Sequence, residues 1–154
     1  MSAILSSIKT YLPQHEGILP HWLLFVSIVA LGNSLQAYLT TSYSSQVYLG
    51  PSPSPAQSSL PPGALSPTTP LSSRTFGTWC VIQSFVRLYA AYYISNPQIY
   101  QMAFLTYVVA WSHFMSEWWV FGTARWGRGL AGPVVIATGS LVWMWVQWEF
   151  YIKA

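Results

Sequence analysis

The chain has 154 residues and a formal net charge of +3, and 53% of its residues are hydrophobic while only 6% are charged. Soluble domains carry roughly 25% charged residues, so the composition excludes an ordinary soluble domain and predicts a membrane protein. The Lys and Arg residues are scattered along the chain, which argues against a nucleic-acid-binding surface.

Residues 1–19 are expected to form a short amphipathic segment that lies on the membrane surface. Ile4 and Ile8 fall on one side of a helical turn with Lys9 opposite, and Pro13 ends the helix. The segment lacks the ordered basic, apolar and small-residue parts of a signal peptide, so we expect it to remain in the mature protein.

Residues 20–39 form the first of four expected transmembrane helices. About twenty apolar residues suffice to cross a bilayer, and Pro20 is well placed at a helix start. Small side chains at helical spacing would let a second helix approach closely. On this span they are Ser27, Ala30, Ser34 and Ala37.

Residues 40–73 are rich in Ser and Pro and show no apolar periodicity. Such a composition is typical of a disordered or polyproline-like loop, and we expect it to act as a spacer between the first two spans. No basic residue flanks the prolines to orient a binding groove, so docking of a proline-recognition domain is the less favoured interpretation.

Three further spans are expected at residues 75–94, 98–121 and 130–152. The turn Ser95-Asn96-Pro97 makes the second and third spans an antiparallel hairpin. The sequence therefore predicts an all-α membrane protein, a four-transmembrane-helix bundle over residues 20–152, preceded by the short N-terminal interfacial amphipathic segment.

The third span carries a polar pair, His113 and Glu117, inside an apolar run. A charge in hydrocarbon costs roughly 2.5–3.5 kcal/mol on insertion scales, so Glu117 is expected to face other helices and find a partner there. Counted along the helices, Arg87 differs from Glu117 in depth by roughly 18 Å at about 1.5 Å per residue, whereas Arg74 falls level with it. We therefore expect Glu117 to lie near Arg74 and His113.

The depths of the polar residues along the helices predict two polar layers, which would hold the helices of the bundle together and support partner binding. The layer near the Ser/Pro-rich loop comprises Asn33, Gln36, Arg74, His113 and Glu117. The layer toward the other side comprises Arg87, Gln83, Gln147 and Glu149. If Arg74 and Glu117 lie far beyond ion-pair distance, this layered arrangement is wrong.

Catalysis by this chain alone is not expected. The spacing of His113 and Glu117 could supply metal ligands or a proton relay, but metal sites generally need three or more ligands, and the other histidines lie toward the opposite side. The sequence has no glycine-rich dinucleotide or phosphate motif, no histidine-box array and no nucleophile elbow. We therefore predict no catalytic residue, no metal and no cofactor.

Four features carry a family resemblance: GNSLQ at residues 32–36, RTFGTW at 74–79, Arg87, and HFMSEWWVFGT at 113–123. In this order they resemble the ergosterol biosynthetic protein 28 family, and the resemblance runs through all four expected spans. The Ser/Pro-rich stretch after Tyr43 looks like a lineage-specific insertion, so no family function is carried over to it.

The resemblance implies an endoplasmic-reticulum membrane protein that has no catalytic activity and tethers the enzymes of sterol C4-demethylation. The implied partners are the sterol C4-methyl oxidase, the C3-sterol dehydrogenase/decarboxylase, the 3-ketosteroid reductase and, in fungi, the sterol C24-methyltransferase. No catalytic residues are assigned in this family, so the resemblance implies none in this chain. Outward-facing aromatic side chains would dock partner helices or membrane lipid, and the candidates are Trp111, Trp118, Trp143 and Trp145.

The residues also support a second hypothesis, a sterol- or lipid-binding carrier in which His113 and Glu117 contact a hydroxyl headgroup. This hypothesis requires a cavity between the helices. The sequence leaves a homo-oligomer open, because Gly132 and Gly139 could serve either a dimer face or internal packing.

The sequence leaves the membrane orientation open, with only a slight excess of basic residues on the loop side. The loop side carries Arg74, Arg125 and Arg128, against Lys9 and Lys153 on the terminal side. The positive-inside rule therefore favours a cytosolic Ser/Pro-rich loop.

Overall fold

The computed structural model describes residues 10–61 and 63–152, and every regular element within these ranges is helical. The elements in chain order are α2 (Leu19–Leu39), α3 (Ser42–Val47), the 3-10 helix η1 (Pro55–Gln57), α4 (Pro70–Tyr92), α5 (Pro97–Trp119), α6 (Arg128–Val146) and α7 (Trp148–Tyr151). The expectation of an all-α fold is therefore confirmed for the described residues. Most of the expected N-terminal amphipathic turn lies outside them.

The three longest helices begin where the sequence marks a helix start. Each has a proline in its first turn. A backbone N–H at this position has no hydrogen-bond partner within the helix, so a residue that lacks the N–H is tolerated there. At the start of α4, the side chains of Thr69 and Ser72 each accept a hydrogen bond from the other residue's backbone N–H. At the start of α5, the Asn96 side chain accepts a hydrogen bond from the Ile99 N–H.

Two expected boundaries differ from the structure. The Ser/Pro-rich range 40–73 contains α3 and η1, and α4 begins at Pro70, earlier than expected. Helix α3 forms because its segment has no proline and buries Ser44 and Val47 against the neighbouring helices. The expected fourth span is divided, because Gln147 departs from helical geometry between α6 and α7.

Helices α2 and α4 pack closely along a seam of small side chains whose hydroxyl groups bond to the opposite backbone. The Ser34 hydroxyl donates to the Gly77 carbonyl over 2.8 Å, and the Ser84 hydroxyl donates to the Ser27 carbonyl over 2.8 Å. Small residues allow this approach, and the two bonds give the buried Ser34 and Ser84 hydroxyls their partners. The small-residue stripe expected on the first span is thus the surface on which α4 packs.

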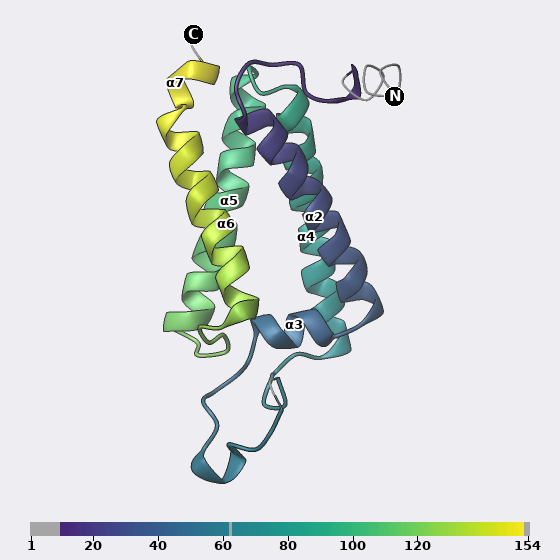
Figure 1. Ribbon diagram of the computed structural model, residues 1–154, viewed down its shortest axis with the longest axis vertical. Coiled ribbons are helices and arrows are strands. Elements are labelled where there is room, and N and C mark those ends of the chain that lie inside the picture. The colour runs from purple at the N-terminus through teal and green to yellow at the C-terminus, as the bar shows by residue number, and fades with distance from the viewer. Residues whose placement is uncertain (1–9, 62, 153–154) are drawn as a thin grey trace, which may run out of the picture.

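Apolar side chains form two cores, one toward each end of the bundle. The core near α7 includes Leu23, Tyr100 and Met144, and the core near α3 includes Val47 and Phe114. Figure 1 shows α2 beside α4 and α5 beside α6, with α3 lying across one end and α7 at the other. The two helix pairs therefore meet through these cores.

Two helices, α2 and α6, are long and apolar enough to cross a membrane, judged by length and composition. Helices α4 and α5 have 23 residues each, roughly 34 Å at about 1.5 Å per residue, but carry more polar side chains. Residues 10–61 and 63–152 thus contain two candidate membrane spans, and the crossing of a membrane by α4 and α5 stays a prediction.

Candidate functional site

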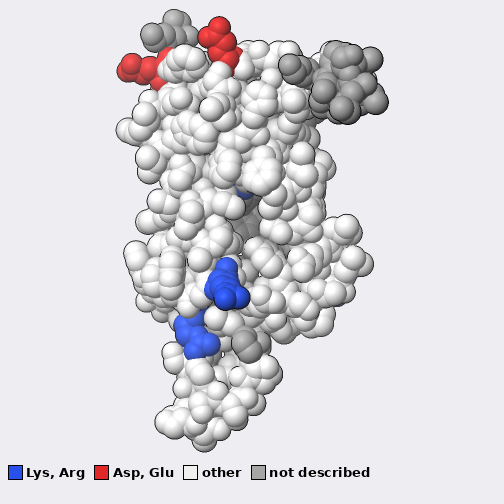
Figure 2. All heavy atoms as spheres, in the orientation of Figure 1, with Lys and Arg blue, Asp and Glu red and all other residues white. Residues whose placement is uncertain are grey.

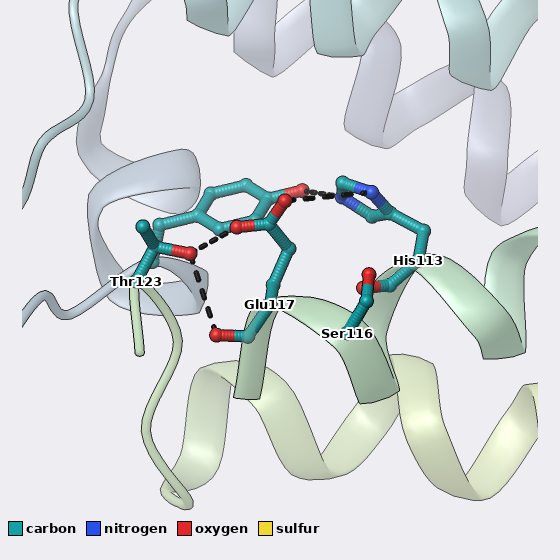
Figure 3. A network of polar contacts seen from close by, with 5 residues as sticks. His113, Ser116, Glu117 and Thr123 are labelled. Carbon is teal, nitrogen blue, oxygen red and sulfur yellow. Dashed lines mark hydrogen bonds and ion pairs between the residues drawn. The ribbon is translucent and has the colours of Figure 1, made fainter. Parts of the chain in front are cut away.

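A chain of polar side chains connects α5 to the loop after α3 and to the turn after α5. The Tyr48 hydroxyl and His113 Nε2 are 2.7 Å apart, and His113 Nδ1 lies 4.0 Å from Glu117 Oε1. The Thr123 hydroxyl donates to the other carboxylate oxygen of Glu117. Figure 3 shows the His113, Glu117 and Thr123 side chains at the end of α5, with Glu117 between the other two. We call Tyr48, His113, Glu117 and Thr123 the His113 cluster.

The tautomer of His113 sets the direction of the hydrogen bonds. Burial, and to a smaller extent the nearby Glu117 carboxylate, raises the pKa of the Tyr48 hydroxyl, so this hydroxyl keeps its proton and can donate or accept. When the imidazole proton is on Nδ1, the nitrogen that faces Glu117, Nε2 accepts a hydrogen bond from the Tyr48 hydroxyl. In this tautomer the cluster runs from a tyrosine donor through a histidine to a carboxylate acceptor.

A cavity of about 370 Å³ opens beside the cluster, and we call it the His113 cavity. Its wall on α4 consists of residues at three- and four-residue spacing, which share one helical face. They are Ser72, Thr75, Phe76 and Trp79. The Trp79 ring packs edge-on against the His113 imidazole, with 5.0 Å between the ring centroids. Such a cavity, mainly apolar with a few convergent polar groups, has the usual composition of a small-molecule pocket.

Three residues expected in the loop-side layer lie elsewhere. Arg74 is exposed and forms no ion pair with Glu117, and within the described residues His113 and Glu117 form the only ion pair. Helical periodicity is the reason, because position 74 lies off the α4 face that lines the His113 cavity. Gln36 is exposed on α2, and Asn33 lines a different cavity. The expected Arg74–Glu117 contact is therefore replaced by contacts to neutral hydroxyl groups.

The second expected layer is also divided. Arg87 is only 6% exposed, and its Nη2 donates to Gln83 Oε1 over 2.6 Å, so these two side chains are brought together. Arg87 Nε donates to the Thr106 hydroxyl of α5 over 3.0 Å. Gln147 and Glu149 lie beyond the end of α6, and Glu149 is exposed. The break after α6 carries both residues away from Arg87.

Sequence reasoning missed Tyr48 and Tyr107 as contributors to these sites. Tyr48 lies in the Ser/Pro-rich range, where no periodicity indicated a buried side chain. Tyr107 lies within an apolar run and packs its ring against the Arg87 guanidinium, 3.9 Å from ring centroid to guanidinium carbon. Thr106 was recognisable, because it shares the small-residue face of its helix with His113.

An alanine at position 129 is expected to displace α3, the helix that precedes Tyr48 in the chain. A Cβ at Gly129 would overlap the Gln46 carbonyl and lie 2.9 Å from the Val47 nitrogen, and backbone atoms cannot turn aside. Overpacking of this kind typically lowers the free energy of unfolding by about 1–3 kcal/mol. Unfolding in mixed detergent micelles measures it, with Gly139→Ala as the control because nothing lies within 4 Å of that position. Equal stability of the two variants would contradict the prediction.

The His113 cluster has the chemistry of a hydrogen-bonding site. Within the part of the chain that the structure describes, no three His, Cys, Asp or Glu side chains gather in a metal-binding arrangement. A carboxylate, an imidazole and a hydroxyl at the wall of one cavity offer both donors and acceptors to an alcohol. The same bonds tie the end of α5 to the loop after α3.

Comparisons with known proteins agree on one family. A family model described as Erg28 like protein matches residues 19–142. Ergosterol biosynthetic protein 28 of Candida albicans is 44% identical over 137 residues, covering 89% of this chain and 90% of that protein. The Saccharomyces cerevisiae protein of the same name is 41% identical over 150 residues, covering 96% and 93%, and the Homo sapiens homolog is 33% identical over 129 residues, covering 84% of each. No solved structure matches. The resemblance seen in the sequence is confirmed, and the chain belongs to the ergosterol biosynthetic protein 28 family.

Proposed function

We propose that this protein is a non-catalytic scaffold of the endoplasmic-reticulum membrane, in which α2, α4, α5 and α6 all cross the bilayer. It holds together the sterol C4-methyl oxidase, the C3-sterol dehydrogenase/decarboxylase and the 3-ketosteroid reductase, with the sterol C24-methyltransferase as a further partner. Family membership supports a place in ergosterol biosynthesis, because the relatives carry that process in their names.

The observation that carries this proposal is the contrast between the inside and the outside of the bundle. Inside, hydroxyl groups between α2 and α4 are bonded to the backbone of the same chain. Outside, large apolar side chains are exposed on each long helix, for example Phe25, Ile82, Leu105 and Val142. Extended exposed apolar surface suits lipid and the transmembrane helices of other proteins.

Two exposed tryptophans are the side chains that we assign to partner contact. Of the four expected to face outward, Trp145 is 69% exposed, whereas the other three are half-buried and pack against the cores. Those three are Trp111, Trp118 and Trp143. Trp119, at the opposite end of the bundle, is 66% exposed. Large aromatic side chains dominate the binding energy of many interfaces, so one contact near each end is expected.

A scaffold needs no reacting groups of its own. Holding two enzymes on one bundle raises their effective concentration toward each other, so that an intermediate reaches the next enzyme without free diffusion. The acid inventory supports a non-catalytic role, because Glu16 and Glu149 are exposed near α7 and Glu117 is the remaining acid.

Affinity purification of the tagged chain from native membranes in mild detergent tests the scaffold. We expect the wild type to recover the sterol C4-demethylation enzymes, with recovery reduced in Trp145→Ala or Trp119→Ala because an exposed contact is removed. An unrelated tagged membrane protein controls for detergent carry-over, and unfolding measurements confirm that the variants fold. Recovery of none of these enzymes by the wild type would contradict the proposal.

The His113 cavity favours a second candidate function, the binding of a sterol or another lipid hydroxyl. His113 and Glu117 both line this cavity, and their side chains are 33% and 22% exposed, so neither is sealed off. Lipid extracted from the same purified samples tests it. A sterol retained by the wild type and by Glu149→Gln, but lost from Glu117→Gln, would favour this candidate over the scaffold alone.

A further inference from the structure

A second cavity, of about 310 Å³, lies between the α2–α4 pair and the α5–α6 pair, and we call it the Arg87 cavity. Figure 2 shows a hollow at mid-height between the two halves, with basic atoms visible at its floor. Phe76 and Arg87 both line the cavity, and Arg87 lies eleven positions after Phe76 on α4, a rise of roughly 16 Å at about 1.5 Å per residue. The cavity is therefore long and follows the helices.

Arg87 lines this cavity as a cation without an anion. Its Nε and Nη2 groups donate to Thr106 and to Gln83 Oε1, which are neutral acceptors. Within the described ranges no carboxylate lies within 4.0 Å of Arg87, and its Nη1 group forms no hydrogen bond. A guanidinium keeps its charge and carries five N–H donors, so a buried one normally has an anionic partner.

A second polar group without a partner lines the same cavity. Tyr107 is 0% exposed, and within the described residues its hydroxyl has no partner at hydrogen-bonding distance and angle, although the Ser140 hydroxyl is close by. The Ser140 oxygen accepts a hydrogen bond from Trp22 Nε1 over 2.9 Å. Enclosed polar groups almost always have partners, so this hydroxyl independently points to a ligand. The guanidinium lies over the Tyr107 ring, so the two polar groups are neighbours.

We propose that the Arg87 cavity binds a carboxylate-bearing amphiphile with a rigid apolar body, in class an acidic sterol, whose carboxylate accepts hydrogen bonds from Arg87 Nη1 and the Tyr107 hydroxyl. The planar guanidinium matches the geometry of a carboxylate. The length of the cavity and its largely apolar wall suit a flat body lying along the helices, with Val26 and Ile136 on opposite sides.

The choice of a sterol body rests on the proposed function, whereas the choice of a carboxylate rests on Arg87 and Tyr107. An oxidase that converts a methyl group to a carboxylic acid, and a decarboxylase that consumes the acid, must pass an anionic sterol between them. A scaffold with a cation in an apolar cavity would retain that intermediate and release the neutral sterols that precede and follow it.

Ligand binding to the purified full-length protein in nanodiscs of neutral phospholipid tests the proposal. The probes are a radiolabelled 3β-hydroxysterol with a 4α-carboxylate, its neutral 4α-hydroxymethyl analogue, and oleate. We expect the wild type to bind the acid roughly tenfold more tightly than the alcohol, because a hydrogen bond to a charged group is among the strongest. Oleate should bind more weakly than the sterol acid, since its chain is flexible.

Tyr107→Phe is the decisive variant, because the hydroxyl that it removes has no hydrogen bond within the described chain. Folding should be unaffected, while affinity for the acid falls roughly tenfold and affinity for the alcohol is unchanged. Arg87→Gln should abolish the preference for the acid, and Tyr93→Phe, at an exposed position, should change nothing. Equal binding of acid and alcohol by the wild type, unchanged acid binding by Tyr107→Phe, or oleate binding as tight as the sterol acid would each overturn the proposal.

These measurements use the isolated protein, so they are separate from the recovery of partner enzymes. Acid-selective binding without enzyme recovery would refute the scaffold and leave the site standing. Enzyme recovery without acid-selective binding would refute the site and leave the scaffold standing.

Discussion

A leucine at position 77 is expected to force α2 and α4 apart. A Cβ at Gly77 would lie 2.8 Å from Tyr38 Cδ2 and 3.1 Å from the Ser34 carbonyl oxygen. The Tyr38 ring is 49% exposed and can turn away, but the Ser34 carbonyl belongs to the helix backbone. Overpacking typically costs about 1–3 kcal/mol, and a whole leucine side chain at this helix contact should reach the upper end of that range. The free energy of unfolding in mixed detergent micelles measures the effect.

Gly32→Leu on α2 is the matched control, because nothing lies within 4 Å of a Cβ at Gly32. It makes the same chemical change on a helix of the same pair, so it should leave the stability nearly unchanged. Gly77→Ala should fall between the wild type and Gly77→Leu. If the two leucine variants lose the same amount of stability, added bulk on any helix is the cause and the seam between α2 and α4 is not decisive.

Cysteines at Ser58 and Ser95 are expected to react from opposite sides of the membrane. Ser58 is exposed in the Ser/Pro-rich loop, and Ser95 is exposed in the turn between α4 and α5, so a crossing by α4 separates them. Figure 2 shows basic side chains near the loop end and acidic ones near the α7 end. The positive-inside rule then favours a cytosolic loop. In sealed vesicles with the cytosolic face outward, an impermeant thiol reagent should label Ser58→Cys and leave Ser95→Cys unlabelled.

Cys80→Ala serves as the background for both variants, because Cys80 is the only native cysteine. This background alone should take up no label, and permeabilised vesicles should label both variants. Labelling of both cysteines in sealed vesicles would show that α4 does not cross the membrane. Labelling of Ser95→Cys alone would show that the bundle crosses with the opposite orientation.

Much of the helical framework could be read from the chain because its causes are local. Long apolar runs and prolines at helix starts predict helices, and the Asn96-Pro97 pair predicts the turn that caps α5. The small-residue stripe on the first span predicts a close helix contact, which α4 supplies through Gly77 and Ser84. The short helix α3 escaped prediction because its stability comes from burying Val47 against α5 and α6, not from its own sequence.

The partners of the polar residues could not be read in the same way. Depth along the helices placed Arg74 level with Glu117, but depth does not fix the direction in which a side chain leaves its helix. Arg74 lies off the cavity-lining face of α4. The Glu117 carboxylate instead accepts a hydrogen bond from Thr123, which lies six residues later, in the turn after α5. Arg87 meets Thr106 because the α4–α5 hairpin sets their register.

Composition, apolar runs and ordered motifs do not depend on how helices face one another, so the all-α class, the long helices and the family follow from the chain alone. Which polar groups remain without partners follows only from how the helices pack. The two helix pairs meet mainly through cores at their ends, so a cavity remains between them, and Arg87 and Tyr107 line it. That arrangement arises from the relative rotation and spacing of whole helices, which many weak contacts set together and no short stretch of sequence encodes.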